Sequence, residues 1–129
     1  MKNIFRLGKK RWKVLIIDDE PDVTRFLQNI LERSGGFEVW AANDPLEGIE
    51  IAKVKQPDAV LLDLVMPKMD GTDVAEKLQA QDTRDIPVIF FSALAAPEDV
   101  QNTRSTVAGR PVIPKALPAQ EIISRLWPA

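Results

Sequence analysis

Short apolar runs alternate with amphipathic segments along the chain, and this alternation limits the possible folds more than any other feature of the sequence. Three of the runs contain only apolar residues, as is typical of strands that are buried on both faces of a parallel sheet. These three runs are residues 14–17, 59–62 and 88–91. They predict the central strands of one sheet.

Two weaker apolar runs predict the remaining strands. Residues 37–40 include a glutamate, and residues 112–113 lie between Pro111 and Pro114. Charged residues and prolines are tolerated at sheet edges more readily than at the centre. We therefore expect the second and fifth strands to form the two edges of the sheet.

Helical patterns fill the segments between the strands. After Pro21, apolar residues recur at steps of three and four as far as the glycine pair at 35–36, which is typical of an amphipathic helix. Residues 44–47, Asp-Pro-Leu-Glu, provide an N-cap acid, a first-turn proline and an acid three residues after the cap. Further helices are expected at residues 72–79, 97–107 and 118–127. The segment 97–107 has few apolar anchors, so we expect its helix to be marginal.

Strands that alternate with helices predict a doubly wound α/β domain with right-handed crossovers. The expected architecture is flavodoxin-like, with a five-stranded parallel sheet in the order 2-1-3-4-5 and five helices. In this order the first and third strands are neighbours, and the loops after them border the crevice in which such folds bind ligands. Asp18, Asp19 and Asp63 lie in those two loops.

Three carboxylates gathered at one place repel each other unless a cation lies between them. The chain contains no Cys and no His, so thiolate and imidazole chemistry and disulfides are excluded. Oxygen ligands favour Mg²⁺, which accepts carboxylates together with phosphate oxygens. Taken singly, Asp18 and Asp19 also fit the cap of the following helix, and Asp63 also fits a turn. Their joint position favours a metal site and, with it, phosphoryl chemistry.

Two further polar side chains follow strand ends on the same rim of the sheet. Ser92 ends the fourth strand, and Lys115 follows the fifth. A hydroxyl, an ammonium and a metal ion are groups that stabilise the charge of a transferring phosphoryl group. A solvated surface lysine is the alternative interpretation of Lys115.

Charge is unevenly distributed along the 129 residues, whose net charge is −2. Residues 1–13 contain six bases and no acid, which leaves 11 bases against 19 acids in the remainder. We expect a basic N-terminal arm at residues 1–11, interpreted as a solubilising tail rather than a contact for nucleic acid, membrane or an acidic partner. One domain is expected at residues 12–127. No apolar run approaches roughly 18 residues, which predicts a soluble, cytoplasmic protein without a membrane partner.

Four stretches of the sequence together resemble one known family. They are IIDDE at 16–20, DLVMPKMDG at 63–71, PVIFFSA at 87–93 and PK at 114–115. Over residues 12–127 the chain resembles the receiver (response regulator) domain of two-component signal transduction. The motif DxxMPxMDG at the end of a third strand is the most specific of these features.

The resemblance implies a role for each residue of the rim. Asp63 is implied as the acceptor of a phosphoryl group from the phosphohistidine of a sensor histidine kinase or a histidine phosphotransfer protein. Ser92 and Lys115 would bind that phosphoryl group. The implied Mg²⁺ ligands are Asp19, Asp63 and the Val65 carbonyl, with Asp18 acting largely through water.

The resemblance also implies how the signal is passed on. Such a domain catalyses its own phosphorylation and dephosphorylation, and it relays the signal by a conformational change in the face built from the fourth helix, fifth strand and fifth helix. The partner would be a downstream protein or a fused output domain, with no direct nucleic-acid binding by the domain itself.

Four positions depart from the family. Val112 stands where an aromatic residue is common, and Ala116 stands where proline usually follows the lysine. The usual aromatic output switch is therefore not expected. Val65 and Leu94 are apolar at positions that in relatives orient the hydrolytic water, so we expect slow loss of the phosphoryl group.

Three other functions compete with this interpretation. A degenerate receiver, acting as a phosphorylation-independent interaction module, is disfavoured because all the rim residues are present. A phosphohydrolase of the haloacid dehalogenase type would need a second acid at position 65, where Val65 stands. A nucleotide-binding module would need GxxxxGK or GxGxxG after the first strand, and neither occurs there.

Overall fold

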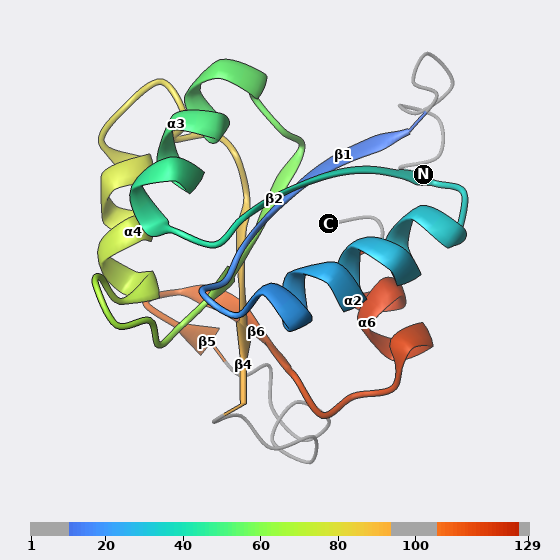
Figure 1. Ribbon diagram of the computed structural model, residues 1–129. Helices are drawn as coiled ribbons and strands as arrows, with labels where there is room; N and C mark the ends of the chain where they lie inside the picture. Colours follow the sequence, from blue (N-terminus) through green and yellow to red (C-terminus); the bar gives the residue numbers. More distant parts are fainter. Residues whose placement is uncertain (1–10, 94–105, 127–129) are drawn as a thin grey trace.

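The computed structural model describes residues 11–93 and 106–126, which form one six-stranded sheet with helices on both faces (Figure 1). The strand order is β2-β1-β3-β4-β6-β5. The strands are β1 (Trp12–Ile17), β2 (Phe37–Ala42), β3 (Ala59–Asp63), β4 (Val88–Ser92), β5 (Thr106–Val107) and β6 (Arg110–Pro114). The helices are α2 (Pro21–Arg33), α3 (Pro45–Lys55), α4 (Gly71–Gln79) and α6 (Ala119–Leu126). The expected basic arm lies outside the described residues, apart from Arg11.

The helices lie in two layers, with α3 and α4 on one face of the sheet and α2 and α6 on the other (Figure 1). Successive residues of a strand point to opposite faces. Leu15 and Ile17 therefore pack under α3 and α4, whereas Val14 and Ile16 pack under α2 and α6. Because both layers need apolar partners, residues 14–17, 59–62 and 88–91 of the central strands are apolar throughout. The doubly wound, flavodoxin-like architecture is confirmed.

The parallel pairing sets the strand ends that carry the polar residues side by side. Ile17 is paired with Leu62, so the residues that follow β1 lie next to the end of β3. In the same way, Asp63 is paired with Phe91, and Ser92 is paired with Pro114. The carboxyl ends of four strands thus bring residues distant in the sequence to one edge of the sheet.

The start of α3 follows the capping pattern expected from the sequence. The Asp44 side chain accepts hydrogen bonds from the amides of Leu46 and Glu47, each at 3.1 Å. The helix then lies very close to β1, because a Cβ added to Gly48 would come within 2.5 Å of Ile17 Cδ1. A larger residue at position 48 would therefore displace the Ile17 side chain.

Two expectations about the second half of the chain were wrong. The strand that contains Val112 is not at the edge, because β5 pairs with β6 in antiparallel orientation. The expected helix at 97–107 lies mostly outside the described residues, but its last two residues form β5. Ala108 and Gly109 have φ values of 53° and 77°, which reverse the chain in the tight turn that joins β5 to β6. The described residues contain four helices, and the segment expected to form a fifth lies outside them apart from Thr106 and Val107.

Candidate metal centre

Three carboxylates meet where β1 and β3 end. Asp18 and Asp19 follow β1, and Asp63 is the last residue of β3. One oxygen from each lies within 4.8 Å of the others. Asp18 and Asp63 are buried, with 1% and 6% of their surfaces exposed, whereas Asp19 is partly exposed. The sequence-based prediction that these acids converge is confirmed.

Lys115, the residue after β6, lies among these acids. Its Nζ is 2.9 Å from Asp18 Oδ2 and 3.4 Å from Asp63 Oδ1. Glu20 Oε1 lies at 3.7 Å, which adds a fourth acid that the sequence reasoning did not assign to the site. Only 17% of the lysine side chain is exposed, so Lys115 is not a solvated surface cation. Three carboxylates, those of Asp18, Glu20 and Asp63, lie within 4 Å of this one ammonium group, so the charges around Lys115 sum to a negative value.

The electrostatics of the site raise the pKa of Asp63 to about 6. Burial is the main cause, and the negative charge of Asp18 adds to it. The Lys115 ammonium and a hydrogen bond from the Val65 amide oppose this rise. For Lys115, burial favours a lower pKa, but the carboxylates of Asp18 and Asp63 outweigh it, so its pKa is raised and it stays charged.

Asp18 and Asp63 also accept hydrogen bonds from nearby backbone amides, as a helix cap or a turn would require. Asp18 Oδ1 accepts the Glu20 amide at 2.9 Å, and Asp63 accepts the Val65 amide. The N-cap residue of α2 is Glu20, however, and its side chain makes no capping hydrogen bond. Each buried acid thus uses backbone contacts to orient its carboxylate, and the remaining oxygens face the site.

The donor set fits a hard divalent cation. Asp18 Oδ2 is fully buried and forms an ion pair with Lys115, but it has no hydrogen bond of good geometry among the described residues. The oxygens of Asp18, Asp19 and Asp63 repel one another, and a cation of charge +2 between them removes that repulsion. With only oxygen donors, Mg²⁺ is the ion whose preferences agree best with the site.

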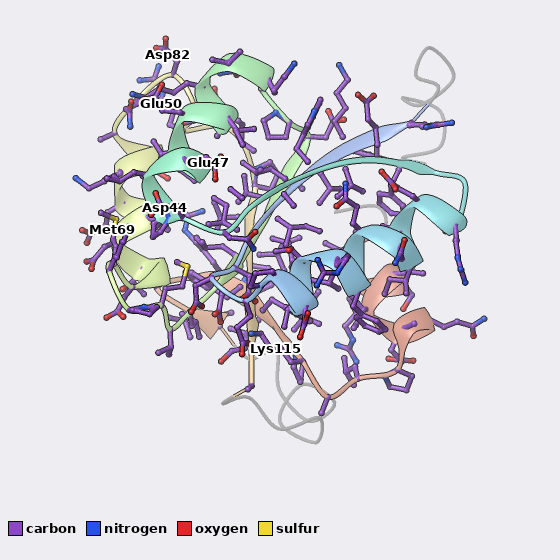
Figure 2. The ribbon with its side chains drawn as sticks, viewed as in Figure 1. Asp44, Glu47, Glu50, Met69, Asp82 and Lys115 are labelled. Carbon is purple, nitrogen blue, oxygen red and sulfur yellow. The ribbon has the colours of Figure 1, made fainter. Side chains whose placement is uncertain are left out.

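The acids and the lysine border an open cleft of about 510 Å³. Ser92 is buried at the end of β4, and Val65 is 57% exposed in the loop after β3. The residues that line the cleft are Asp19, Glu20, Asp63, Val65, Met66, Pro67, Ser92, Ala93 and Lys115. The structure therefore brings every site residue predicted from the sequence to this cleft, with Asp18 buried behind it. In the side-chain view, Lys115 lies near the carboxyl ends of the strands (Figure 2).

The loop between β3 and α4 is held tightly against the end of β3. The Gly71 amide donates to the Leu64 carbonyl at 2.7 Å. A Cβ at position 71 would collide with the Asp63 carbonyl oxygen, so this position requires glycine. Met66 is buried in the core under α3 and α4, in agreement with its expected role in packing. The motif DLVMPKMDG thus forms a loop whose last residue, Gly71, packs against the backbone of Asp63 and Leu64.

With this geometry in place, comparison with known proteins identifies the chain. Residues 14–126 match the response regulator receiver domain family. The chain therefore belongs to that family, whose members are signalling domains of phosphorelay systems.

Individual relatives support the same assignment. The DNA-binding dual master transcriptional regulator RpaA of Synechocystis is 39% identical over 88 residues, which are 67% of this chain and 36% of RpaA. The chemotaxis protein CheY4 of Vibrio cholerae has the same fold, with a TM-score of 0.77 at 23% identity, over 91% of this chain and 97% of CheY4. The receiver domain of Francisella response regulator 1452 has a TM-score of 0.72 at 26% identity, over 90% and 93% of the two chains. The chain spans about a third of the length of transcriptional regulators such as RpaA.

Two of the departures from the family can be compared with the described residues. Val112 is buried in β6 and faces the core under α3 and α4. Leu94, whose apolar character underlies part of the expectation of slow phosphoryl loss, lies outside the described residues.

Within the described residues, no helix combines the length and the apolar character needed to cross a membrane.

Proposed function

We propose that Asp63 accepts a phosphoryl group in a Mg²⁺-dependent reaction and that the chain acts as a phosphorelay receiver. The observation that carries the proposal is the position of the Asp63 carboxylate. It lies within 4.8 Å of two further acids and 3.4 Å from the Lys115 ammonium, and it borders an open cleft. A carboxylate nucleophile, a cation site and a fixed ammonium are the groups that phosphoryl transfer requires.

The transfer is a displacement at phosphorus. A carboxylate oxygen of Asp63 forms the new P–O bond, the P–N bond to the donor histidine breaks, and the leaving imidazole takes up a proton. Asp19, Asp63 and the Val65 carbonyl are the proposed direct ligands of Mg²⁺, with Asp18 acting largely through water. When bound, the ion would neutralise charge on the phosphoryl oxygens. Lys115 and Ser92 line the same cleft and supply a positive charge and a hydroxyl to those oxygens.

A protein donor is favoured by the surface next to the cleft. Phe26 of α2 is 52% exposed and borders a second, smaller pocket of about 200 Å³. Lys115 lines both that pocket and the cleft. An apolar surface beside the acceptor allows a sensor histidine kinase or a histidine phosphotransfer protein to bind while its phosphohistidine reaches Asp63. A downstream protein or a fused output domain is the proposed recipient of the signal, in the cytoplasm.

The proposed output is a population shift that begins at Lys115 and Ser92. The Lys115 amide donates to the Ser92 carbonyl at 2.9 Å, and α6 begins four residues after Lys115. Movement of these two residues toward a phosphoryl group therefore pulls on β6 and α6. Amide hydrogen exchange in α6 should change on phosphorylation, and equal protection in both states would contradict this route.

Intact-mass analysis after incubation with acetyl phosphate and Mg²⁺ tests the acceptor. We expect a gain of one phosphoryl group in the wild type, no gain in Asp63→Asn, and an unchanged gain in Asp58→Asn, which alters an acid at the opposite end of β3. Chelation of Mg²⁺ should abolish the gain in the wild type. Failure of the wild type to gain mass would instead favour a degenerate receiver that acts as an interaction module.

A further inference from the structure

Two successive residues outside the cleft connect the two loops that carry the acids. Asn43 and Asp44 form the turn between β2 and α3, and neither lines the cleft. Asn43 contacts the loop after β1, and Asp44 contacts the loop after β3. The turn between β2 and α3 therefore contacts both loops that carry the acids of the candidate metal centre, from outside the cleft.

The contact on the first side reaches the backbone of a metal-site acid. Asn43 Nδ2 donates to the Asp18 carbonyl oxygen at 2.9 Å and to Thr24 Oγ1 at 3.1 Å. Thr24 is buried, and its hydroxyl donates to the Pro21 carbonyl at 3.0 Å. The Asp18 amide donates to the Ala42 carbonyl at 3.1 Å. Both polar groups of the Asp18 backbone are thus held by the end of β2 and the residue after it.

The contact on the second side is an ion pair with the loop after β3. Asp44 Oδ1 lies 2.8 Å from Lys68 Nζ, while Oδ2 accepts the Leu46 and Glu47 amides at the start of α3. Because the helix fixes one oxygen, the carboxylate presents the other in a defined direction. The hydrogen bond from Lys68 lowers the pKa of Asp44, and the pair therefore stays ionised near neutral pH. Figure 2 shows Asp44 at the start of α3, on the same side of the molecule as Met69.

This connection matters because the acids repel one another. Asp18 and Asp19 belong to one loop and Asp63 borders the other, so repulsion between the carboxylates favours separation of the two loops. A group that holds both loops at the spacing required for a cation reduces the free energy needed to organise the site.

We propose that Asn43, Asp44 and Lys68 are positioning residues that hold the two acidic loops at the spacing needed for Mg²⁺ binding. We name these three residues the loop clasp. The inference rests on the proposed function, because it concerns the same Mg²⁺ site. None of the three residues touches the reacting atoms, so their effect is transmitted through Asp18 and through the loop after Asp63.

Variants of the full chain test the loop clasp through Mg²⁺ binding. Lys68→Met removes the ammonium and keeps the apolar stem, Asp44→Asn keeps an N-cap residue and removes the charge, and Asn43→Ala removes the amide donor. Isothermal titration calorimetry should show the Mg²⁺ Kd raised about twofold to fivefold in the first two variants. In Asn43→Ala we expect a rise of about twofold to tenfold. Lys68→Arg should restore the wild-type Kd.

A matched control separates the loop clasp from general surface electrostatics. Lys53→Met breaks an exposed ion pair with Glu50 within α3 that joins no loops, and it should leave the Mg²⁺ Kd unchanged. The double variant Asp44→Asn/Lys68→Met should bind Mg²⁺ about as well as either single variant, because both remove the same interaction. Acetyl phosphate labelling at saturating Mg²⁺ should stay within about twofold of wild type, since the reacting groups are intact.

The outcomes distinguish this inference from the proposed function. Wild-type protein that binds Mg²⁺ and labels on Asp63, combined with unchanged Kd values in all three clasp variants, would overturn the loop clasp alone. Equal weakening in Lys53→Met would overturn it too. Wild-type protein that neither binds Mg²⁺ nor labels would overturn the proposed function and the loop clasp together.

Discussion

Lys115 and Asp63 face each other at the cleft with Nζ 3.4 Å from Oδ1, but the lysine lies closer to Asp18, at 2.9 Å. One ammonium group is thus shared between a buried acid and the proposed acceptor. Because Lys115 also pairs with Asp18, its ammonium lies beside the Asp63 carboxylate, which still borders the cleft. A phosphoryl group on Asp63 would bring more negative charge to the lysine than the carboxylate does, so the balance of this sharing is expected to change on phosphorylation.

Lys115→Met should slow labelling of Asp63 by acetyl phosphate by about tenfold to a hundredfold at neutral pH and saturating Mg²⁺. The substitution removes the charge that stabilises the transferring phosphoryl group. It also removes an interaction that lowers the pKa of Asp63, so a smaller fraction of the acceptor is ionised. The rate is measured by intact mass against time. Lys115→Arg is the control, and it should retain more activity because the positive charge remains.

The raised pKa of Asp63 predicts a specific pH dependence of stability without Mg²⁺. The folded pKa is about 6 and the ordinary value is 3.8, so between these values the folded state binds more protons than the unfolded state. The contribution of Asp63 is fully present below pH 3.8 and is lost as the pH rises through 6. The loss is on the order of 2 to 3 kcal/mol in the free energy of unfolding.

Urea unfolding of the wild type and Asp63→Asn at several pH values measures this contribution. The difference between the two curves isolates the acceptor, because the other titrating groups are common to both proteins. We expect Asp63→Asn to gain stability relative to wild type as the pH rises from 4 to 7. Addition of Mg²⁺ should restore the stability of the wild type near pH 7. A difference that is constant with pH would show that the pKa of Asp63 is not raised in the folded state.

Much of this site was predictable because parallel strands bring their carboxyl ends to one edge. The apolar runs that end at Ile17 and Leu62 set the acids side by side, and the motif after Asp63 is specific to one family. Glu20 was missed because an acid at the start of a helix also fits a first-turn position, and only the folded chain brings its carboxylate near Lys115. A local sequence pattern does not predict which charged residue, distant in the sequence, a long side chain such as that of Glu20 will contact.

The errors in the fold have a similar origin. Pro97, Glu98 and Asp99 favour a helix start, but Thr106 and Val107 pair with the strand that follows. The pairing depends on a turn in which Ala108 adopts a positive φ, and alanine gives no sequence signal for such a conformation. The loop clasp was also missed, because the pairing of Asp44 with Lys68 joins residues 24 positions apart.

Val65 is expected to make the phosphorylated state long-lived. Its side chain is exposed at the cleft but offers no hydrogen-bonding group to orient a water molecule for attack on phosphorus. Val65→Asn should therefore speed loss of the phosphoryl group by about tenfold, measured by intact mass after removal of the donor. Val65→Ile is the control and should decay at the wild-type rate, whereas equal acceleration by both would point to loop disturbance.

Phe26 should distinguish a protein donor from a small one. Its ring is half exposed beside the pocket that Lys115 also lines, so a protein donor that approaches Asp63 buries it, whereas acetyl phosphate needs only the cleft. We expect Phe26→Ala to slow phosphotransfer from a histidine phosphotransfer protein about tenfold and to leave acetyl phosphate labelling unchanged. Leu46→Ala removes a comparably exposed side chain from α3, on the other face of the sheet, and should affect neither donor. Phosphotransfer that is equally fast in wild type and Phe26→Ala would place the docking surface elsewhere.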